Sequence, residues 1–223
     1  GGMTLVSLSC LLVPNPVRLE RTSSKIKTHM AIFLSPLFIF FLITTGLTHV
    51  SHSVLYGFGT LYWRSLGHSE VIIGLFWSVG VLAEIVLFTT IGRIEKQIGY
   101  LFLLSLASVA AAIRWPLLAI FDSQFAIILL QILHGFTFGA AHLGAMAFLT
   151  QNVPREISAT GQSLYYTLVG GIFSGCMLPF AGMLYSDLAG DAFFVMSCVA
   201  GCSLISLFIL NQIAKQNPEA ISN

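Results

Sequence analysis

Three ionisable side chains interrupt long apolar runs of this sequence, and their types are those that bind protons and anions. They are the carboxyl group of Glu84, the permanent cation of Arg114 and the imidazole of His134. At the centre of a membrane such a side chain costs about 2.5–3.5 kcal/mol on insertion scales, so pairing, packing or a wet cavity must offset that cost. We therefore treat these positions as candidates for a proton or anion pathway.

The surroundings of Glu84 have a pattern of their own. Trp77 lies seven residues earlier and Gly80 four residues earlier, so a helix places all three on one face. That face would present an aromatic ring, a gap and a carboxyl group. The alternative interpretation is a neutral glutamate that caps a neighbouring helix contact.

Arg114 occurs in the run Ile113-Arg114-Trp115-Pro116, near the outer end of an apolar stretch. It either snorkels to the surface, with Trp115 as an interfacial anchor, or points inward to hold an anion or Glu84. Helix rise places Arg114 and Glu84 roughly 10 Å apart along the membrane normal. Contact through His134 or through a substrate is therefore easier than a direct pair.

A polar stripe surrounds His134. Gln131, His134 and Thr137 are spaced by three residues and share one side of a helix, and His142 lies about 80° away around that helix. A lone buried histidine is usually structural. Two histidines on one spanning helix, with a glutamine beside them, favour the lining of a cavity.

A second stripe belongs to an earlier apolar stretch. His49, His52, Ser53 and Tyr56 recur at the three-to-four spacing of a helix face. They form either a helix seam held by hydrogen bonds or the opposite wall of the same cavity, and the sequence does not choose between these.

Composition identifies the medium in which these residues must be positioned. Hydrophobic residues make up 56% of the 223 residues, charged residues only 9%, and mean hydropathy is +0.89. Soluble domains carry about 25% charged residues, and a soluble protein of this composition would expose too much apolar surface. The sequence therefore predicts a membrane protein, and its net charge of +1 gives no electrostatic reason to bind nucleic acid.

Apolar stretches long enough to span a bilayer predict an all-α membrane bundle of six helices. A spanning helix needs about 20 apolar residues, and a lipid-exposed strand would need an alternating pattern that is missing here. The six stretches run at about 31–60, 70–91, 99–120, 125–149, 160–185 and 191–213. Two GxxxG pairs, Gly135 with Gly139 and Gly171 with Gly175, predict close helix contacts or a hinge for rocking.

The basic residues predict an orientation. Lys and Arg favour cytoplasmic loops, and if the faces alternate, one face collects nearly all of them. They are Arg18, Arg21, Lys25, Lys27, Arg93, Lys96, Arg155 and Lys215, whereas the other face has only Arg64. We therefore expect a multi-pass protein of the bacterial inner membrane with both ends cytoplasmic. Residues 1–13 would be the tail of a preceding helix, 14–30 a basic cytoplasmic linker and 214–223 a cytoplasmic tail.

The sequence lacks residues that the two enzymatic alternatives would require. An intramembrane serine protease needs a histidine on a later helix, and no histidine follows Ser174. His49-x-x-His52 has plausible metal spacing, but no HExxH motif is present. Four cysteines, none in a CxxC pair, are interpreted as small packing residues. We expect neither an enzyme nor a bound cofactor, and a channel or an interaction subunit stays open.

Three runs resemble a known family of transporters. Residues 74–84 (GLFWSVGVLAE), residues 113–115 (IRW) and residues 130–146 (LQILHGFTFGAAHLGAM) resemble the eighth, ninth and tenth helices of 3-phenylpropionate transporter-like proteins. These are major facilitators, related to lactose permease and the nucleoside–proton symporters. The resemblance covers about residues 30–213. It implies one half of a twelve-helix fold, built from two inverted three-helix repeats, with the substrate site at mid-membrane between the halves.

Lactose permease adds an expectation about mechanism. Its glutamate, arginine and histidine for sugar recognition and proton coupling correspond by order and spacing to Glu84, Arg114 and His134. Its proton-carrying glutamate corresponds to Thr137, and its preceding lysine to Gln131, so the proton site of the permease is not preserved here.

The resemblance and the buried residues together predict a half of a secondary transporter, in which protons and a small organic solute are the ligands. The bilayer and an N-terminal six-helix half, or a second copy of the chain, would be its partners. Arg114 and Trp77 suit an aromatic carboxylate such as 3-phenylpropionate, and sugars and nucleosides are alternative substrates. The competing hypothesis is a six-helix product that only folds or pairs in the membrane and does not transport.

Overall fold

The computed structural model describes residues 30–91 and 98–216. Within these ranges the chain is almost entirely helical and no residue lies in a strand. The expected helix tail at 1–13, nearly all of the linker at 14–30 and most of the tail at 214–223 lie outside the described residues. So do the basic residues of the loop at 92–97.

The helices follow one another with short connections. They are η1 (Ala31–Leu34), α3 (Pro36–Val50), α4 (Ser53–Ser65), α5 (Glu70–Ile91), α7 (Tyr100–Ile120), α8 (Gln124–His134), η2 (Gly135–Ala140), α9 (Ala141–Asn152), η3 (Arg155–Ile157), α10 (Ser158–Tyr165), η4 (Tyr166–Phe173), α11 (Ser174–Leu188), η5 (Ala189–Asp191) and α12 (Ala192–Gln216). The residues at the start of α3 are typical of a helix N-terminus. Ser35 caps α3 by accepting a hydrogen bond from Phe38 N at 3.3 Å, and Pro36 occupies the first turn.

Within the described ranges, five helical stretches are long and apolar enough to cross a membrane. They are Pro36–Ser65, Glu70–Ile91, Tyr100–Ile120, Gln124–Asn152 and Arg155–Gln216. The last has 62 residues and contains a turn, η5, at which Ala189 adopts a positive φ of 47°. The stretches expected at 160–185 and 191–213 fall on the two arms beside this turn.

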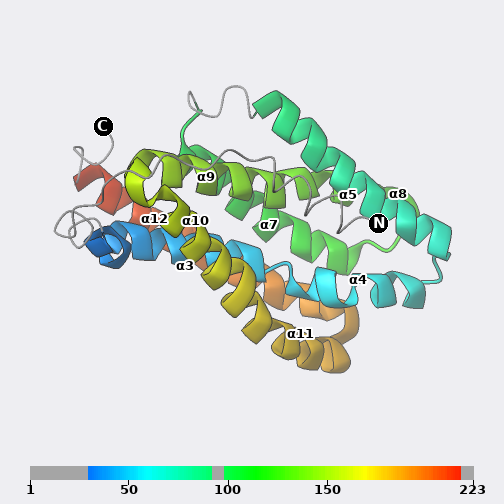
Figure 1. Cartoon of the computed structure of the whole chain (residues 1–223). Helices are drawn as coiled ribbons and strands as arrows, with labels where there is room; N and C mark the ends of the chain where they lie inside the picture. Colours follow the sequence, from blue (N-terminus) through cyan, green and yellow to red (C-terminus); the bar gives the residue numbers. More distant parts are fainter. Residues whose placement is uncertain (1–29, 92–97, 217–223) are drawn as a thin grey trace, which may run out of the picture.

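The long helices lie side by side in one bundle (Figure 1). α12 packs along α7 and α3, α5 packs along α8 and η2, and α11 packs against α4. At one end, Gly161 lies against Phe33, which brings α10 to the start of α3. At the other end, His68 Nε2 donates to Asp122 O at 3.0 Å, joining the α4–α5 and α7–α8 connections.

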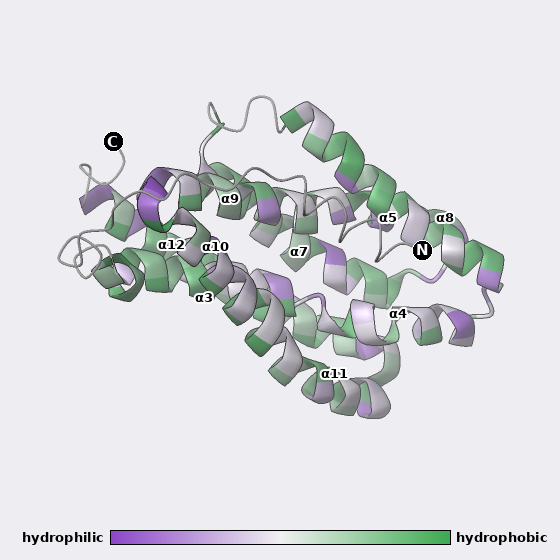
Figure 2. Ribbon diagram, in the orientation of Figure 1, coloured by the Kyte–Doolittle hydropathy of each residue, from purple (hydrophilic) through white to green (hydrophobic). Residues whose placement is uncertain are grey.

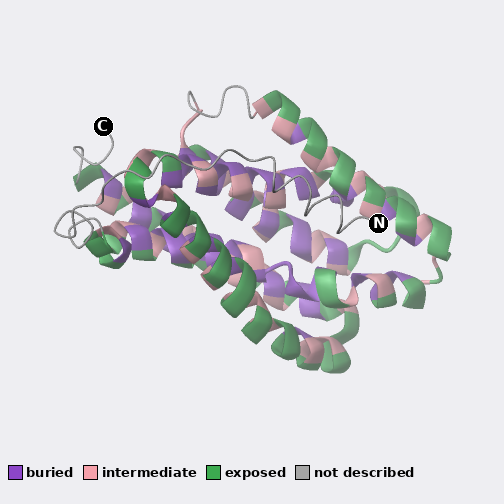
Figure 3. Cartoon of the chain, in the orientation of Figure 1, coloured by how far each residue is buried: buried purple, intermediate pink, exposed green. Residues whose placement is uncertain are grey.

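Apolar side chains cover much of the outer surface of the bundle. In α5 only 22% of the most apolar window is buried within the described chain, compared with 67% for the stretch that contains α3 and α4. The ribbon of α5 is largely hydrophobic in Figure 2 and largely exposed in Figure 3. Water would not tolerate so continuous an apolar face, so α5 must meet lipid or another helix.

Three of the stretches are interrupted in mid-course. α3 and α4 are separated by a turn at Ser51 and His52, and η2 and η4 are short π-helical segments inside longer helices. At the first break, Ser51 Oγ donates to Thr48 O at 2.7 Å and the His52 ring bonds the same carbonyl at 2.9 Å. Such side chains compete with the backbone ladder, and π-helical turns often mark functional positions.

Glycines set how closely α5 and η2 approach. A Cβ added at Gly135 would lie 2.7 Å from Ala83 O, and one at Gly139 would lie 3.1 Å from Leu87 Cδ2. This pair therefore makes the close helix contact that its spacing predicts. The second pair differs, because a Cβ at Gly175 would meet nothing within 4 Å and one at Gly171 only Tyr166 O at 3.8 Å.

Candidate functional site

Arg114 of α7 lies at the centre of a buried polar cluster. Its side chain is 0% exposed, so it points into the bundle and does not snorkel. Nε donates to Leu130 O at 2.8 Å, Nη1 donates to His134 Nδ1 at 3.0 Å and to Thr137 Oγ1 at 3.2 Å, and Nη2 donates to Gln131 Oε1. All four acceptors are uncharged and belong to α8 and η2. They account for most of the five N–H donors of a guanidinium.

The hydrogen bond from Arg114 determines which nitrogen of the neutral His134 ring carries the proton. A guanidinium can only donate, so Nδ1 of His134 must be the acceptor and the proton of the neutral ring must sit on Nε2. Nε2 lies 2.9 Å from Oε1 of Glu84 on α5. One imidazole thus joins the cation on its inner side to the carboxyl group on its outer side. The link between Arg114 and Glu84 runs through His134 and not through a direct ion pair.

Gln131 ties this cluster to α5. Its Oε1 accepts from Arg114 Nη2, and its Nε2 donates to Phe76 O at 3.1 Å. The amide therefore satisfies both a buried charge and a backbone carbonyl. Since Phe76 precedes Glu84 by two turns on α5, the same bond helps to fix the helix that carries the carboxyl group.

Thr137 connects the cluster to the break between α3 and α4. Its Oγ1 lies 3.1 Å from His52 Nε2, and the Nδ1 of His52 bonds Thr48 O. Trp115 covers His52 edge-on at 4.8 Å between ring centroids, and its Nε1 donates to Ser51 Oγ at 3.0 Å. His52 thus belongs to a hydrogen-bonded seam that also borders the polar cluster.

Tyr56 and Trp77 form the open edge of the cluster. Tyr56 is 44% exposed within the described chain, stacks against Trp77 with centroids 6.4 Å apart and meets the His134 ring edge-on at 5.9 Å. Its hydroxyl lies 3.4 Å from His134 Nε2, a longer contact than that of Glu84. Glu84 keeps 18% of its side chain exposed on the same edge. A ligand arriving here would meet aromatic rings beside a carboxyl group and an imidazole.

His49 and His142 lie in a neighbouring cavity. This cavity has about 50 Å³ of space, enough for one or two water molecules, and Thr45 and Tyr166 also line it. His142 packs near Phe88 and Tyr166, at centroid distances of 5.8 and 6.4 Å. Neither histidine is among the groups that contact Arg114, whereas the other candidates belong to the cluster or its edge.

Comparison with known proteins identifies the family. The profile of the MFS_1 like family matches residues 3–196. The chain belongs to this major facilitator family. It is also 31% identical, over 160 residues, to an Escherichia coli (strain K12) protein named "Probable 3-phenylpropionic acid transporter". That match covers 72% of this chain and 42% of the relative, so the chain spans less than half of the relative's length. No solved structure matches the chain.

These findings confirm the resemblance to major facilitators and the all-helical fold. With its apolar helices, the chain is a multi-pass membrane protein of a transporter family. The matched region includes all three runs that carried the resemblance, at residues 74–84, 113–115 and 130–146.

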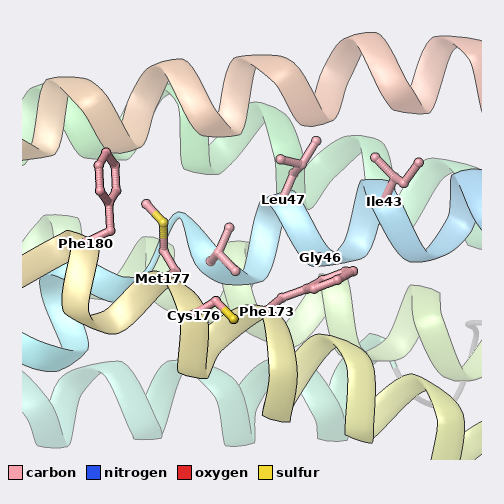
Figure 4. Close-up of a pocket in the computed structure, with 8 residues that line it drawn as sticks. Ile43, Gly46, Leu47, Phe173, Cys176, Met177 and Phe180 are labelled. Carbon is pink, nitrogen blue, oxygen red and sulfur yellow. The ribbon is translucent and has the colours of Figure 1, made fainter.

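Two apolar grooves of this major facilitator chain contain none of the residues of the polar cluster. One groove of about 450 Å³ lies between α3 and the η4–α11 helix, where Phe173 approaches Gly46 (Figure 4). A second groove of about 450 Å³ lies between α5 and the continuous α8–η2 helix. Neither is lined by a charged side chain, so both suit lipid or another helix better than a polar solute.

Sequence reasoning missed the small hydroxyl residues that hold the helix break. Thr48 Oγ1 contacts Ser108 Oγ at 3.2 Å, and Thr44 Oγ1 contacts Ser206 Oγ at 2.8 Å. The run Thr44, Thr45, Thr48 and Ser51 has helical spacing inside an apolar stretch, which was the available signal. Polar residues at this spacing are expected to bond across helices.

Proposed function

We propose that this chain forms one half of a proton symporter that carries a small aromatic carboxylate across a bacterial inner membrane. The observation that carries the proposal is the chain of contacts from Arg114 through His134 to Glu84, which ends at an exposed edge lined by Tyr56 and Trp77. If Glu84 and Arg114 served only to stabilise the fold, the carboxyl group of Glu84 would not need to be partly exposed.

Glu84 is the proton carrier in this proposal. Burial favours the neutral form of a carboxyl group, and a nearby cation favours its charged form. Glu84 lies between these influences, with one side exposed and His134 and Arg114 on the other. Rocking of the halves would change which influence is stronger, so that Glu84 binds a proton on one side of the membrane and releases it on the other.

The aromatic edge and the relative support the substrate class. Tyr56 and Trp77 offer flat apolar faces to an aromatic ring, and stacked or edge-on pairs add about 0.5–1.5 kcal/mol to ordinary burial. Because the donors of Arg114 are already engaged, we propose that the cation acts on a substrate carboxylate through His134. Sugars and nucleosides are the alternative substrates.

The proposed orientation places both ends of the chain in the cytoplasm. Among the described residues, Arg155 and Lys215 lie at one end of the bundle, and Glu70, Asp122 and Asp191 at the other. Basic residues favour the cytoplasmic face. The other half of the site would come from an N-terminal six-helix half or from a second copy of the chain.

The first test replaces Glu84 by Gln in the transporter assembled from this chain and its other half. We expect proton-driven accumulation to fall at least tenfold, because the amide cannot take up a proton. Glu70→Gln is the matched control, since Glu70 is an exposed acid that pairs with Arg64 at the tip of the bundle. Unchanged accumulation with Glu84→Gln would disprove the role of Glu84.

A competition panel tests the substrate class. Unlabelled 3-phenylpropionate should displace a labelled aromatic carboxylate, whereas a disaccharide and a nucleoside should not. Displacement by the disaccharide or the nucleoside alone would move the proposal to that substrate class.

A second candidate function rests on the exposed face of α5. The chain can be a membrane interaction subunit that pairs through its apolar surface without transporting. Cross-linking in native membranes would detect a paired product. Transport by a purely monomeric chain would exclude this alternative.

A further inference from the structure

Trp77 is held in one orientation by a hydrogen bond to α4 and by a second tryptophan. Its Nε1–H donates to Thr60 Oγ1 at 3.0 Å, across the contact between α4 and α5. The Trp63 ring meets the Trp77 ring edge-on, with centroids 5.3 Å apart. Trp63 is itself 0% exposed, so dense packing keeps this neighbour in place. The indole of Trp77 is therefore fixed before any ligand arrives.

We infer that Thr60 determines the preference of this site for aromatic acids, because its hydrogen bond holds the Trp77 indole in the orientation against which a substrate ring packs. This inference rests on the proposed function and narrows the substrate class to acids with a planar aryl group. Thr60 is a positioning residue in it, since it acts through Trp77.

The hydroxyl that fixes the indole and the phenol that flanks it come from the same helix. Thr60 follows Tyr56 by four residues on α4, so their side chains share one face of that helix. The rings of Tyr56 and Trp77 have centroids 6.4 Å apart and planes 25° apart. One face of α4 thus sets the position of both aromatic rings at the edge of the cluster.

The backbone of α4 closes another side of the indole. A Cβ at residue 59 would lie 3.6 Å from Trp77 Cζ2 and 3.0 Å from Leu55 Cδ1, so Gly59 lets the indole lie against the helix. Trp77 still keeps part of its surface exposed within the described chain. That part of the ring is available to a ligand, while the rest is bounded by α4 and Trp63.

A fixed indole favours an aromatic ligand over a saturated one. A side chain that is ordered before binding does not lose its freedom when the ligand arrives, which strengthens binding. The attraction between two aromatic rings also depends on their relative orientation, because each ring has a negative face and a positive edge. A saturated ring has no such charge distribution. Loss of the fixed orientation should therefore weaken the binding of a phenyl group more than that of a cyclohexyl group.

The bond of Thr60 could instead serve only to join α4 to α5. These helices also meet where Trp63 packs edge-on against Phe76 at 5.1 Å, and where Arg64 pairs with Glu70 at 2.7 Å. Neither contact involves Thr60, so the helix pair has other support. A purely structural bond predicts an equal loss of affinity for all acids, whereas the inferred role predicts a loss that is selective for aryl acids.

Equilibrium binding to membranes that contain the assembled transporter tests the inference. The probes are radiolabelled 3-phenylpropionate and 3-cyclohexylpropionate, which share a carboxylate and a chain length but differ in aromaticity. We expect the unchanged transporter to prefer the phenyl acid. Thr60→Val keeps the side-chain shape without the hydroxyl, and it should lower this preference about two- to tenfold. Thr60→Ser, which retains the acceptor, should keep the preference.

Two further variants complete the test. Thr89→Val makes the same chemical change at an exposed position of α5 and should leave the preference unchanged. Trp77→Phe removes the donor of the same bond, and it keeps the test decisive if Thr60→Val does not fold. Combining Trp77→Phe with Thr60→Val should lower the preference no further than Trp77→Phe alone, because both changes remove one interaction.

The outcomes separate this inference from the proposed function. If Thr60→Val weakens both acids equally or leaves the phenyl preference intact, the inference is wrong and the symporter proposal stands. Additive effects in the double variant, or equal binding of the two acids by the unchanged transporter, would also overturn it. If the unchanged transporter binds neither acid, the proposed substrate class is wrong and the inference is wrong with it.

Discussion

Arg114 shows why residue type alone does not reveal how a buried cation is used. A guanidinium at this depth can snorkel, pair with a carboxylate or bind an anion directly. Here its donors meet a backbone carbonyl, a hydroxyl, an amide and an imidazole. The charge is therefore solvated by neutral groups, and its influence reaches Glu84 through a ring whose tautomer it selects.

Gln131 is predicted to stabilise the cluster. Gln131→Leu would remove the acceptor of Arg114 Nη2 and the donor to Phe76 O, leaving two buried polar groups without this partner. Such losses cost about 1–3 kcal/mol. The free energy of unfolding in mixed micelles should fall by about that amount. Gln162→Leu, at an exposed position of α10, is the control, and equal effects of the two changes would contradict the prediction.

Gly80 is predicted to set the position of His134. A Cβ at residue 80 would lie 3.3 Å from Cδ2 of His134 and 3.6 Å from its Cβ. Gly80→Ala should therefore push the imidazole away from Glu84 and reduce the transport rate several-fold. Uptake by the assembled transporter measures the effect. Gly74→Ala is the matched control on the same helix, because a Cβ there meets nothing within 4 Å.

At the scale of elements, two of the helical stretches that border the site are interrupted beside it. The turn at Ser51–His52 and the π-helical η2 both adjoin the polar cluster, and neither stretch contains proline at its break. At the first break, the hydroxyl of Ser51 and the imidazole of His52 both bond the Thr48 carbonyl. Irregular backbone is tolerated inside a membrane where protein satisfies it, so the breaks belong on the inner side of these helices.

The close approach of α5 and η2 is predicted to depend on Gly135. Gly135→Ala would place a Cβ 2.7 Å from Ala83 O, so one backbone must move. Overpacking of this kind costs about 1–3 kcal/mol. Unfolding in mixed micelles should detect it, together with a lower transport rate as Glu84 shifts. In the control Gly175→Ala, the added Cβ meets nothing within 4 Å, and an equal loss of stability there would refute the explanation.

At the scale of the whole molecule, charge and hydropathy are distributed around an asymmetric bundle. Acidic residues gather beside the α4–α5, α7–α8 and α11–α12 connections, and Arg155 and Lys215 lie at the opposite end. The outward face of α5 is apolar and largely exposed (Figures 2 and 3). The same surface therefore meets lipid or another helix.

Orientation can be measured by thiol labelling. In a cysteine-free background, Ser123→Cys should react with a membrane-impermeant reagent applied outside intact cells, and Glu156→Cys should react only after permeabilisation. Both positions are exposed at the bundle ends. The expectation follows from the bias of basic residues toward the cytoplasm. The reverse labelling pattern would invert the proposed topology.

The sequence by itself determined the medium, the helical class and the residues of interest. Apolar runs of spanning length leave the backbone no alternative to internal hydrogen bonding, and the cost of burying charge makes Glu84, Arg114 and His134 conspicuous. The family resemblance rested on runs that contain these same residues. Such properties follow from local composition and spacing, which need no knowledge of how the helices pack.

Only the tertiary structure decided which of these residues meet. It joined Arg114 to Glu84 through His134, and it drew His52 into the seam between α3 and α4. It also placed His49 and His142 around a small cavity that adjoins the cluster at His52 and Thr137. Helical periodicity gives the direction of a side chain on its own helix but not the rotation, depth or break of the helix that faces it. Those depend on contacts between distant segments, such as Gly135 against Ala83, that no local pattern contains.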